Sequence, residues 1–296
     1  MKRHKKFLYF LTGIGIIINC ISCTCVNEKN AVKENDNFTA IENKNFSNIQ
    51  YLLPSPGEIL ERIQGAKIQF QPDFVNSIAN KDKYIGSRAQ SLNLGIYITD
   101  MAYSALSGRA SETAKYLETI QSLSSEVGIS ISVFETLIER AKTNAGIMDS
   151  LVNISNEAFA NMSEFLEAGS QENTLALIST GAYVECLYLS LKSVSNYSDE
   201  NPFLTLISEM KYPLDNLYER AQTNPQDENI QTVVNYLDQI ILIFNDLDSK
   251  SSKTVISKDE NGDLLVLGGD SINLNGDDFI SLKDKIIEIR SKIISY

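Results

Sequence analysis

Two acidic residues of this 296-residue chain stand in stretches that are largely apolar. Asp100 lies in Leu94-Gly-Ile-Tyr-Ile-Thr-Asp-Met-Ala-Tyr103, and Glu185 lies in Gly181-Ala-Tyr-Val-Glu-Cys-Leu-Tyr188. A carboxylate buried in such surroundings needs a hydrogen-bonding or charged partner, or else it takes up a proton. Carboxyl groups in that state are common acids and bases of active sites, so these two residues are the first candidates for chemistry.

A ligand pocket around these acids is the functional interpretation, and it would bind a small molecule or carry out acid–base chemistry. Its candidate residues are Asp100, Glu185, Tyr97, Tyr188 and Arg140. The structural interpretation, which we favour, is an internal salt bridge to Arg140 or Arg88, or an exposed helix face, because structural ion pairs produce the same pattern. We assign no catalytic residue, since a pair of carboxylates alone is weak evidence for a glycosidase.

Two stretches near the C-terminus space oxygen-bearing side chains in the alternating way that calcium loops do. They are Asp259-Glu-Asn261-Gly-Asp263 and Asn273-Leu-Asn275-Gly-Asp277. However, Leu264 stands where an EF-hand loop requires glycine, and no bidentate glutamate follows at the required position. We therefore interpret Asn261-Gly262 as a hairpin turn and Asp277 as a helix cap, and we expect no metal or other cofactor.

The N-terminus has the pattern of a bacterial lipoprotein signal peptide. A basic segment, residues 1–6, precedes an uncharged apolar run, residues 7–18, which is short for a transmembrane helix. The serine before Cys23 resembles the small residue of a lipobox, so we expect cleavage there and attachment of lipid, palmitate included, to Cys23. Cys20 stands where leucine is usual, which leaves Cys20 or Cys25 as alternatives, alongside an uncleaved anchor or an ordinary secretory signal.

Cleavage of this signal peptide would change the composition of the chain and exclude further classes of function. The chain has 26 basic and 38 acidic residues; residues 1–22 hold four of the basic ones and no acid, so the remainder has 22 basic residues and a formal net charge of −16. Such a surface repels phosphate backbones, which argues against nucleic acid as a partner. The only histidine, His4, leaves with the leader. Histidine-dependent catalysis and histidine metal sites are therefore excluded.

Helices must position these residues, because apolar side chains recur at helical spacing between capping and stop signals. We expect helices from Ser55 through Gln64, Arg88–Leu106, Ser111–Val127, Ser132 to about Ala168, Gln171–Val194, Asn201 to Ala221 with a kink at Pro213, Asn224 to Leu247, and Asp278–Ile294. The segment Gln171–Val194 is apolar on most faces, which predicts a central place in the fold.

The predicted fold is all-α, an antiparallel multi-helix bundle with a small β-hairpin before the C-terminal helix. A helix-pair solenoid is less favoured, because no repeat of fixed period is present. The expected organisation is a signal peptide over residues 1–22, a flexible tether over 23–53, the helical bundle over 54–250, and a hairpin with the C-terminal helix over 251–296, packed on the bundle.

Several segments together resemble a family of uncharacterised helical lipoproteins from the Bacteroidota. These segments are Leu92-Asn-Leu-Gly-Ile-Tyr97 with Asp100 and Tyr103, Val127-Gly-Ile129, Leu137-Ile-Glu-Arg140, Asp149-Ser-Leu151, and Gly181 with Glu185 and Leu187-Tyr188. The resemblance covers about residues 54–195 and leaves out the tail from about 251. It implies a bacterial envelope location and a helical fold, and it transfers no catalytic residue.

These patterns favour a lipid-anchored protein of the bacterial cell envelope, at the outer membrane. The expected function is a non-catalytic module that binds another envelope protein or a small ligand, with the N-terminal lipid holding it to the membrane. The alternative is a carboxylate-dependent enzyme with a pocket around Asp100 and Glu185. The two differ because the enzyme requires both acids to converge in one pocket.

Overall fold

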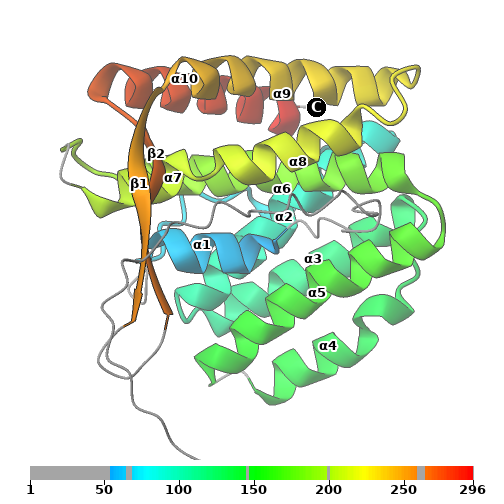
Figure 1. Ribbon diagram of the computed structural model, residues 1–296. Helices are drawn as coiled ribbons and strands as arrows, with labels where there is room; N and C mark the ends of the chain where they lie inside the picture. The colour runs from blue at the N-terminus through cyan, green and yellow to red at the C-terminus, as the bar shows by residue number, and fades with distance from the viewer. Residues whose placement is uncertain (1–53, 65–68, 145–146, 199–200, 259–263, 296) are drawn as a thin grey trace, which may run out of the picture. The chain divides into compact units, whose positions relative to one another are not determined.

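The computed structural model describes residues 54–64, 69–144, 147–198, 201–258 and 264–295 (Figure 1). The predicted signal peptide, the lipidation site Cys23 and the tether lie outside the described residues. Within the described part, helices make up most of the chain, which confirms the all-α class.

The elements of the described residues follow one another in chain order as α1 (Pro56–Gln64), the short 3-10 helix η1 (Ile78–Lys83), α2 (Ser87–Leu106), α3 (Ala110–Glu126), α4 (Ser132–Thr143), α5 (Met148–Ala168), α6 (Glu172–Ser193), α7 (Pro202–Ser208), α8 (Lys211–Ala221), α9 (Glu228–Asp246), β1 (Asp248–Lys258), β2 (Leu264–Asn273) and α10 (Gly276–Ile294). Consecutive helices such as α2 and α3 pack side by side across short connections, so they run in opposite directions.

The helices α2 and α6 form the centre of the bundle (Figure 1). Residues 91–105 of α2 and 175–191 of α6 are buried without interruption. One hydrophobic cluster joins these helices to α3, α4 and α5, and a second joins them to α7, α8, α9 and α10. Both helices are covered on all sides, which explains why they are apolar on most faces. The central place predicted for α6 is confirmed.

The length and composition of α6 would also allow it to cross a membrane. In the 18-residue window of α6 whose mean hydropathy is high enough for a membrane-spanning helix, 94% of the residues are buried inside the bundle. The same composition is expected of the core helix of a folded domain. Among the described residues, no other helix passes this test.

The two central helices approach each other at two glycines. A Cβ atom on Gly95 would lie 1.9 Å from the carbonyl oxygen of Ile178, and one on Gly181 would lie 1.9 Å from the carbonyl oxygen of Leu92. Such a backbone-to-backbone approach leaves no room for any side chain at either position. It brings the two candidate acids, which these helices carry, within reach of each other.

Local signals set several helix ends as predicted. The backbone N–H of Ser55 donates to Glu58 Oε2 at 2.8 Å and the N–H of Glu58 donates to Ser55 Oγ at 3.2 Å, which confirms the capping box of α1. Gly108 and Gly128 follow α2 and α3 with φ angles of 68° and 83°. Glycine adopts this left-handed conformation without the strain that a Cβ atom would add, so both helices stop there.

The long helix predicted from Ser132 to about Ala168 is wrong, because α4 and α5 are separate helices. The helix α4 ends at Thr143 with Asn144 as its C-cap, and α5 begins at Met148; residues 145–146 between them lie outside the described residues. The capping box predicted at Ser132 does not form either. Ile131 holds the N-cap position of α4, and no side chain caps it.

The single kinked helix predicted from Asn201 to Ala221 is also two helices, α7 and α8. The chain breaks at Glu209 and Met210, ahead of Pro213 rather than at it. A proline ring clashes with the carbonyl group four residues earlier, here that of Glu209, so an uninterrupted helix is disfavoured at that point.

Two helix starts are capped by residues other than those expected. Asp227 caps α9, its Oδ1 accepting from the N–H of Asn229 at 2.8 Å, so α9 begins later than the Asn224 predicted for it. Asn275, rather than Asp277, caps α10, and its Oδ1 accepts from the N–H of Asp277 at 3.0 Å. Each cap satisfies N–H groups that a helix start leaves without intrahelical partners.

The strands β1 and β2 follow α9 and pair antiparallel, with Asp248 opposite Asn273 and Lys258 opposite Leu264. The loop between them, residues 259–263, lies outside the described residues, so the predicted β-hairpin stays a prediction. The C-terminal helix α10 packs against α6 and α9. It contributes to the second hydrophobic cluster and belongs to the bundle itself.

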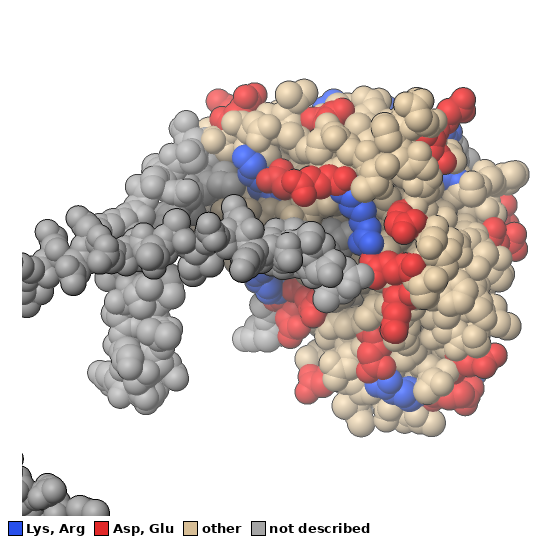
Figure 2. Space-filling model, turned by 45° about the vertical axis from the view of Figure 1, so that its right-hand side comes forward, with Lys and Arg blue, Asp and Glu red and all other residues tan. Residues whose placement is uncertain are grey.

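The surface of the described residues is acidic on the face seen in Figure 2, where Asp and Glu side chains outnumber Lys and Arg. This agrees with the formal net charge of −12 for the whole chain. An acidic surface favours solubility and disfavours contact with other polyanions.

Candidate functional site

Asp100 of α2 and Glu185 of α6 meet in the core, where both side chains are fully buried. Their carboxyl groups lie close enough to share a hydrogen bond. The close approach of the two glycine-bearing helices makes this meeting possible. The structure thus brings together the two acids that the sequence singled out.

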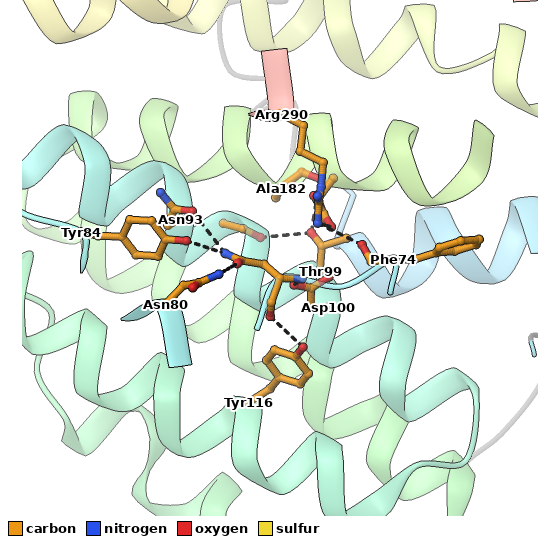
Figure 3. Close-up of polar contacts among 12 residues, drawn as sticks. Phe74, Asn80, Tyr84, Asn93, Thr99, Asp100, Tyr116, Ala182 and Arg290 are labelled. Carbon is orange, nitrogen blue, oxygen red and sulfur yellow. Dashed lines mark hydrogen bonds and ion pairs between the residues drawn. The ribbon is translucent and has the colours of Figure 1, made fainter. Parts of the chain in front are cut away.

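Arg290 of α10 is the charged partner of Glu185. Its Nε donates to Glu185 Oε2 at 2.5 Å and its Nη2 donates to Glu185 Oε1 at 2.8 Å, so the pair is bidentate. The same Nη2 donates to the carbonyl oxygen of Phe74 at 3.0 Å (Figure 3). The guanidinium carbon lies 4.0 Å from the ring centre of Tyr188, which adds a cation–π contact. Glu185 is therefore a fully paired carboxylate.

Asn76, in the irregular segment before η1, is the hub of the polar network around Asp100. Its backbone N–H donates to Asp100 Oδ2 at 2.9 Å, and its carbonyl oxygen accepts from the Tyr116 hydroxyl at 2.9 Å. Its side-chain Nδ2 donates to the Tyr84 hydroxyl at 2.8 Å, and its Oδ1 accepts from Asn80 Nδ2 at 2.8 Å. One residue thereby fixes the segment that covers the acid pair.

Asp100 is the member of the acid pair whose pKa is raised. Burial raises the pKa of Asp100 well above its usual range, the neighbouring Glu185 raises this pKa further, and Arg290 opposes the increase. Two adjacent carboxylates in a buried site cannot both stay ionised, and Arg290 holds the charge of Glu185. Asp100 Oδ1 has no partner among the described hydrogen bonds. A proton on Oδ1 gives it one, since the hydroxyl can donate to Glu185.

Asp100→Asn is expected to stabilise the protein at neutral pH. The raised pKa means that the folded state holds the proton more tightly than the unfolded chain, so this stabilisation is complete below the unfolded pKa and is lost as pH rises through the folded pKa. An amide makes the same hydrogen bonds without the proton. The difference in free energy of unfolding between variant and wild type should therefore grow from about pH 4 upward, by up to about 1.4 kcal/mol per pH unit.

Urea denaturation at several pH values measures this difference. Asp100→Ala is the control, because it leaves Glu185 and the backbone N–H of Asn76 without this partner and should destabilise the protein at every pH. An Asp100→Asn variant whose stability relative to wild type stays constant or falls with pH would mean that Asp100 is ionised in the fold.

The other candidate residues of the pocket have separate roles. Tyr188 lies over Arg290 as described, at the ion pair itself. The Tyr97 hydroxyl donates to the carbonyl oxygen of Ser77 at 2.9 Å, and its ring packs between those of Tyr84 and Tyr116. Burial raises the pKa of Tyr97, so its hydroxyl stays protonated and serves as a donor.

Arg140 is not a partner of the acids, which corrects the sequence prediction. It lies on α4 and forms a bidentate ion pair with Glu157 of α5, in which the two side chains are 37% and 44% exposed. The second candidate, Arg88, donates to Thr232 Oγ1 at 3.3 Å. The partner of Glu185 is instead Arg290, which comes from the last helix.

The sequence did hold a signal for Arg290. Ile286, Ile289 and Ile293 recur at helical spacing, and residue 290 completes the pattern i, i+3, i+4, i+7 on the same face. An arginine on an apolar face needs a buried acid. The position of Arg290 on this apolar face therefore predicts an ion pair with a buried acid such as Glu185 or Asp100.

The acid network is a structural junction rather than an open site. Neither Asp100 nor Glu185 lines the groove described below or the two smaller cavities found beside it. The network joins α2, α6 and α10, and Asn93 of α2 adds a further link by donating to the carbonyl oxygen of Ile293 at 2.9 Å. Asp100 Oδ2 and both oxygens of Glu185 accept from protein donors, which leaves little capacity for a substrate.

A groove of about 740 Å³ lies elsewhere, between the start of α1, one face of α5, and parts of α6 and α8. Its apolar surface includes Phe159, Ala160 and Leu175. Its volume falls in the range of roughly 300–1,000 Å³ typical of small-molecule sites. The groove is therefore large enough to hold a small-molecule ligand.

Two buried hydroxyl groups in this groove have no hydrogen-bond partner in the described structure, those of Ser163 on α5 and Ser179 on α6. Ser179 is only 4% exposed. Other hydroxyls of α6 are satisfied within the helix, since Thr180 donates to the carbonyl oxygen of Ala176 at 2.8 Å and Ser190 to that of Cys186 at 2.6 Å. Buried polar groups are normally paired, so these two hydroxyls have hydrogen-bonding capacity that the described chain does not use.

Metal ligands do not gather in the described residues, in which no group of three or more His, Cys, Asp or Glu side chains is placed to hold an ion. Of the two stretches with calcium-like spacing, residues 259–263 lie outside the described residues. In the second, the Asn275 side chain caps α10.

Comparison with known proteins adds no relative. The chain matches no protein-family model, no curated protein and no solved structure. The resemblance to helical lipoproteins of the Bacteroidota therefore stays an expectation from the sequence, and the functional argument rests on this molecule alone.

Proposed function

We propose that the protein is a lipid-anchored, non-catalytic binding module of the bacterial cell envelope, located at the outer membrane, whose ligand occupies the groove along α5. The ligand is a small molecule or a segment of another envelope protein. No nucleic acid takes part, because the acidic surface repels it. We further propose that β1 and β2 form a hairpin that belongs to the same domain.

The groove is the observation that carries this proposal. It combines an apolar floor with two unpartnered hydroxyls, which is the composition of a ligand site: mostly apolar walls with a few polar groups that orient the ligand. The groups that would instead support catalysis, Asp100 and Glu185, are enclosed in a paired network. Binding is therefore better supported than acid–base chemistry.

A carboxylate-dependent enzyme stays the second candidate, because the two acids do converge and Asp100 has a raised pKa. The Asp100→Asn variant separates the two functions. An enzyme that uses Asp100 loses its activity in this variant, whereas a binding module keeps its ligand and gains stability.

The lipid anchor is supported by the basic segment, the short apolar run and the cysteine cluster that follows them. Labelling of the full-length protein with a palmitate analogue in a bacterial host tests this part. We expect Cys23→Ser to lose both the label and membrane association, and Cys20→Ser and Cys25→Ser to keep them. If Cys23→Ser kept the label, Cys23 would not be the lipidated residue, and the lipid would have to be attached elsewhere.

Crosslinking and affinity capture of the lipidated protein from its own membranes tests the binding function. The matched control is Ala160→Trp, which adds a large side chain to an exposed position of the groove without disturbing the core. Whatever the groove holds should be recovered with the wild type and lost with Ala160→Trp, as read by mass spectrometry of proteins and small molecules. Identical recovery from both would show that the groove is not the binding site.

A further inference from the structure

We infer that the groove along α5 binds an extended aliphatic ammonium ligand, with Glu164 as its ionic partner and the hydroxyls of Ser163 and Ser179 as further acceptors. This inference rests on the proposed binding function and names its ligand class. The ammonium group could belong to a free polyamine or to a lysine side chain of a peptide, and both sources share the chemistry that the groove would recognise.

The length of the groove favours an extended ligand. The residues of α5 that line it recur from Asn156 to Glu167 along one helix face. Eleven residues of helix rise about 16 Å, which is several times the length of a compact amine such as ethylamine. A flexible chain with an apolar stem would follow this face, with its methylene groups against Phe159 and Leu175.

The charge of the groove favours a cation. Four carboxylates line it, but three of them already have partners: Glu58 accepts from the N–H of Ser55, Glu157 pairs with Arg140, and Glu167 pairs with Arg220. The fourth, Glu164, forms no ion pair among the described residues, which leaves a negative charge on the groove.

The hydroxyl groups point to the same ligand. Acidic residues alone are common on helix surfaces, but Ser179 is more than nine-tenths buried, lines the groove and has no partner in the described structure. An ammonium group has three donors and no acceptor, so it requires several acceptors at once. Glu164 supplies a charged one, and the hydroxyls of Ser163 and Ser179 supply neutral ones.

Titration calorimetry on the full-length lipidated protein in detergent tests this inference with defined probes. Spermidine and an acetylated, amidated Lys-Ala-Lys peptide are the two cationic probes, and 1,8-octanediol and octanedioate are the uncharged and anionic counterparts of similar length. We expect at least one cationic probe to bind, in a salt-dependent manner, and neither counterpart to bind. Spermidine alone would identify a free polyamine as the source, and the peptide alone would identify a lysine side chain.

Three variants locate the site. Glu164→Gln should weaken binding of the cationic probe about tenfold, which is the loss expected for one charged hydrogen bond. Ala160→Trp should abolish it. Glu118→Gln, an equally exposed acid on α3 outside the groove, should leave it unchanged.

Two results would overturn the inference. Equal weakening by Glu164→Gln and Glu118→Gln would mean attraction to the overall negative charge and no specific site. Absence of binding by both cations, or binding of octanedioate instead, would mean that the ligand class is wrong. The ligand class can be wrong while the binding function is right. In that case Ala160→Trp would still fail to recover a molecule that the wild type captures from membranes.

Discussion

Replacing Arg290 with methionine is expected to lower the free energy of unfolding by about 3–5 kcal/mol, because it leaves the Glu185 carboxylate buried without its counter-charge. Glu185 is fully buried and Arg290 is 7% exposed, so water cannot take the place of the guanidinium. The change also removes the donor to the carbonyl oxygen of Phe74. Methionine keeps much of the side-chain length, so the loss reports mainly the charge and its hydrogen bonds.

Arg140→Met is the matched control for this prediction. It breaks another bidentate arginine–glutamate pair with the same substitution, but the partners there are 37% and 44% exposed. Exposed pairs contribute about 0–1 kcal/mol, so the control should lose no more than that. Urea denaturation of both variants at one pH and salt concentration measures the difference, which isolates the effect of burial.

A third variant tests whether the loss comes from the unpaired charge. Glu185→Gln combined with Arg290→Met removes both charges, and part of the stability should return, since apolar or neutral replacements of both partners are far less costly than removal of one. An Arg290→Met variant that loses no more than Arg140→Met would contradict the assigned role of the buried pair.

Burial of the acids could be predicted because each one interrupts an apolar run of helical length, whereas the sequence left open whether the two acids converge. The sequence of α2 around Asp100 and that of α6 around Glu185 have no polar face on which a carboxylate could reach water. The identity of the partner could not be predicted in the same way. Arg290 lies 105 residues beyond Glu185, and only the packing of α10 against α6 decides that these two meet.

Asn76 was missed for a different reason. It lies in an irregular segment without hydrophobic periodicity, and an asparagine there reads as an ordinary loop residue. Its importance comes from five hydrogen-bonded neighbours in three-dimensional space, which no local sequence pattern indicates. Backbone N–H and C=O groups of an irregular segment can form hydrogen bonds with buried side chains. No pattern of residue types in the sequence indicates such bonds.

The groove was also beyond the reach of the sequence. Ser163 and Ser179 look like the other serines of α5 and α6, most of which donate to a carbonyl group of their own helix. What distinguishes them is the absence of such a partner at residues that line the groove. Helix ends were more predictable where a local cap sets them, as at Ser55, and less where one helix ends and another soon begins, as between α7 and α8.

The second large effect is expected at the crossing of α2 and α6. Gly181→Ala should lower the free energy of unfolding by about 3 kcal/mol or more, at the upper end of the range for overpacked cores. Alanine favours a helix by about 1 kcal/mol relative to glycine, so the steric clash at the helix crossing must cost more than this gain. It does so because the added Cβ would lie 1.9 Å from the carbonyl oxygen of Leu92, a backbone atom that no rotamer change can move. Gly95→Ala should behave alike, since its Cβ meets the carbonyl oxygen of Ile178 at the same distance.

Gly276→Ala is the control for these variants, because it makes the same chemical change inside α10 where the added Cβ meets only the Tyr197 ring, at 3.4 Å or more. Its stability in urea should equal or slightly exceed that of the wild type. Separation of α2 from α6 would also pull Asp100 away from Glu185, so Gly181→Ala should lessen the gain that Asp100→Asn gives at neutral pH. Additive effects of Gly181→Ala and Asp100→Asn would mean that the crossing and the acid pair are independent, since coupled sites depart from additivity by about 0.5–3 kcal/mol. Non-additivity of that size would tie the glycine crossing to the protonation of the buried acid.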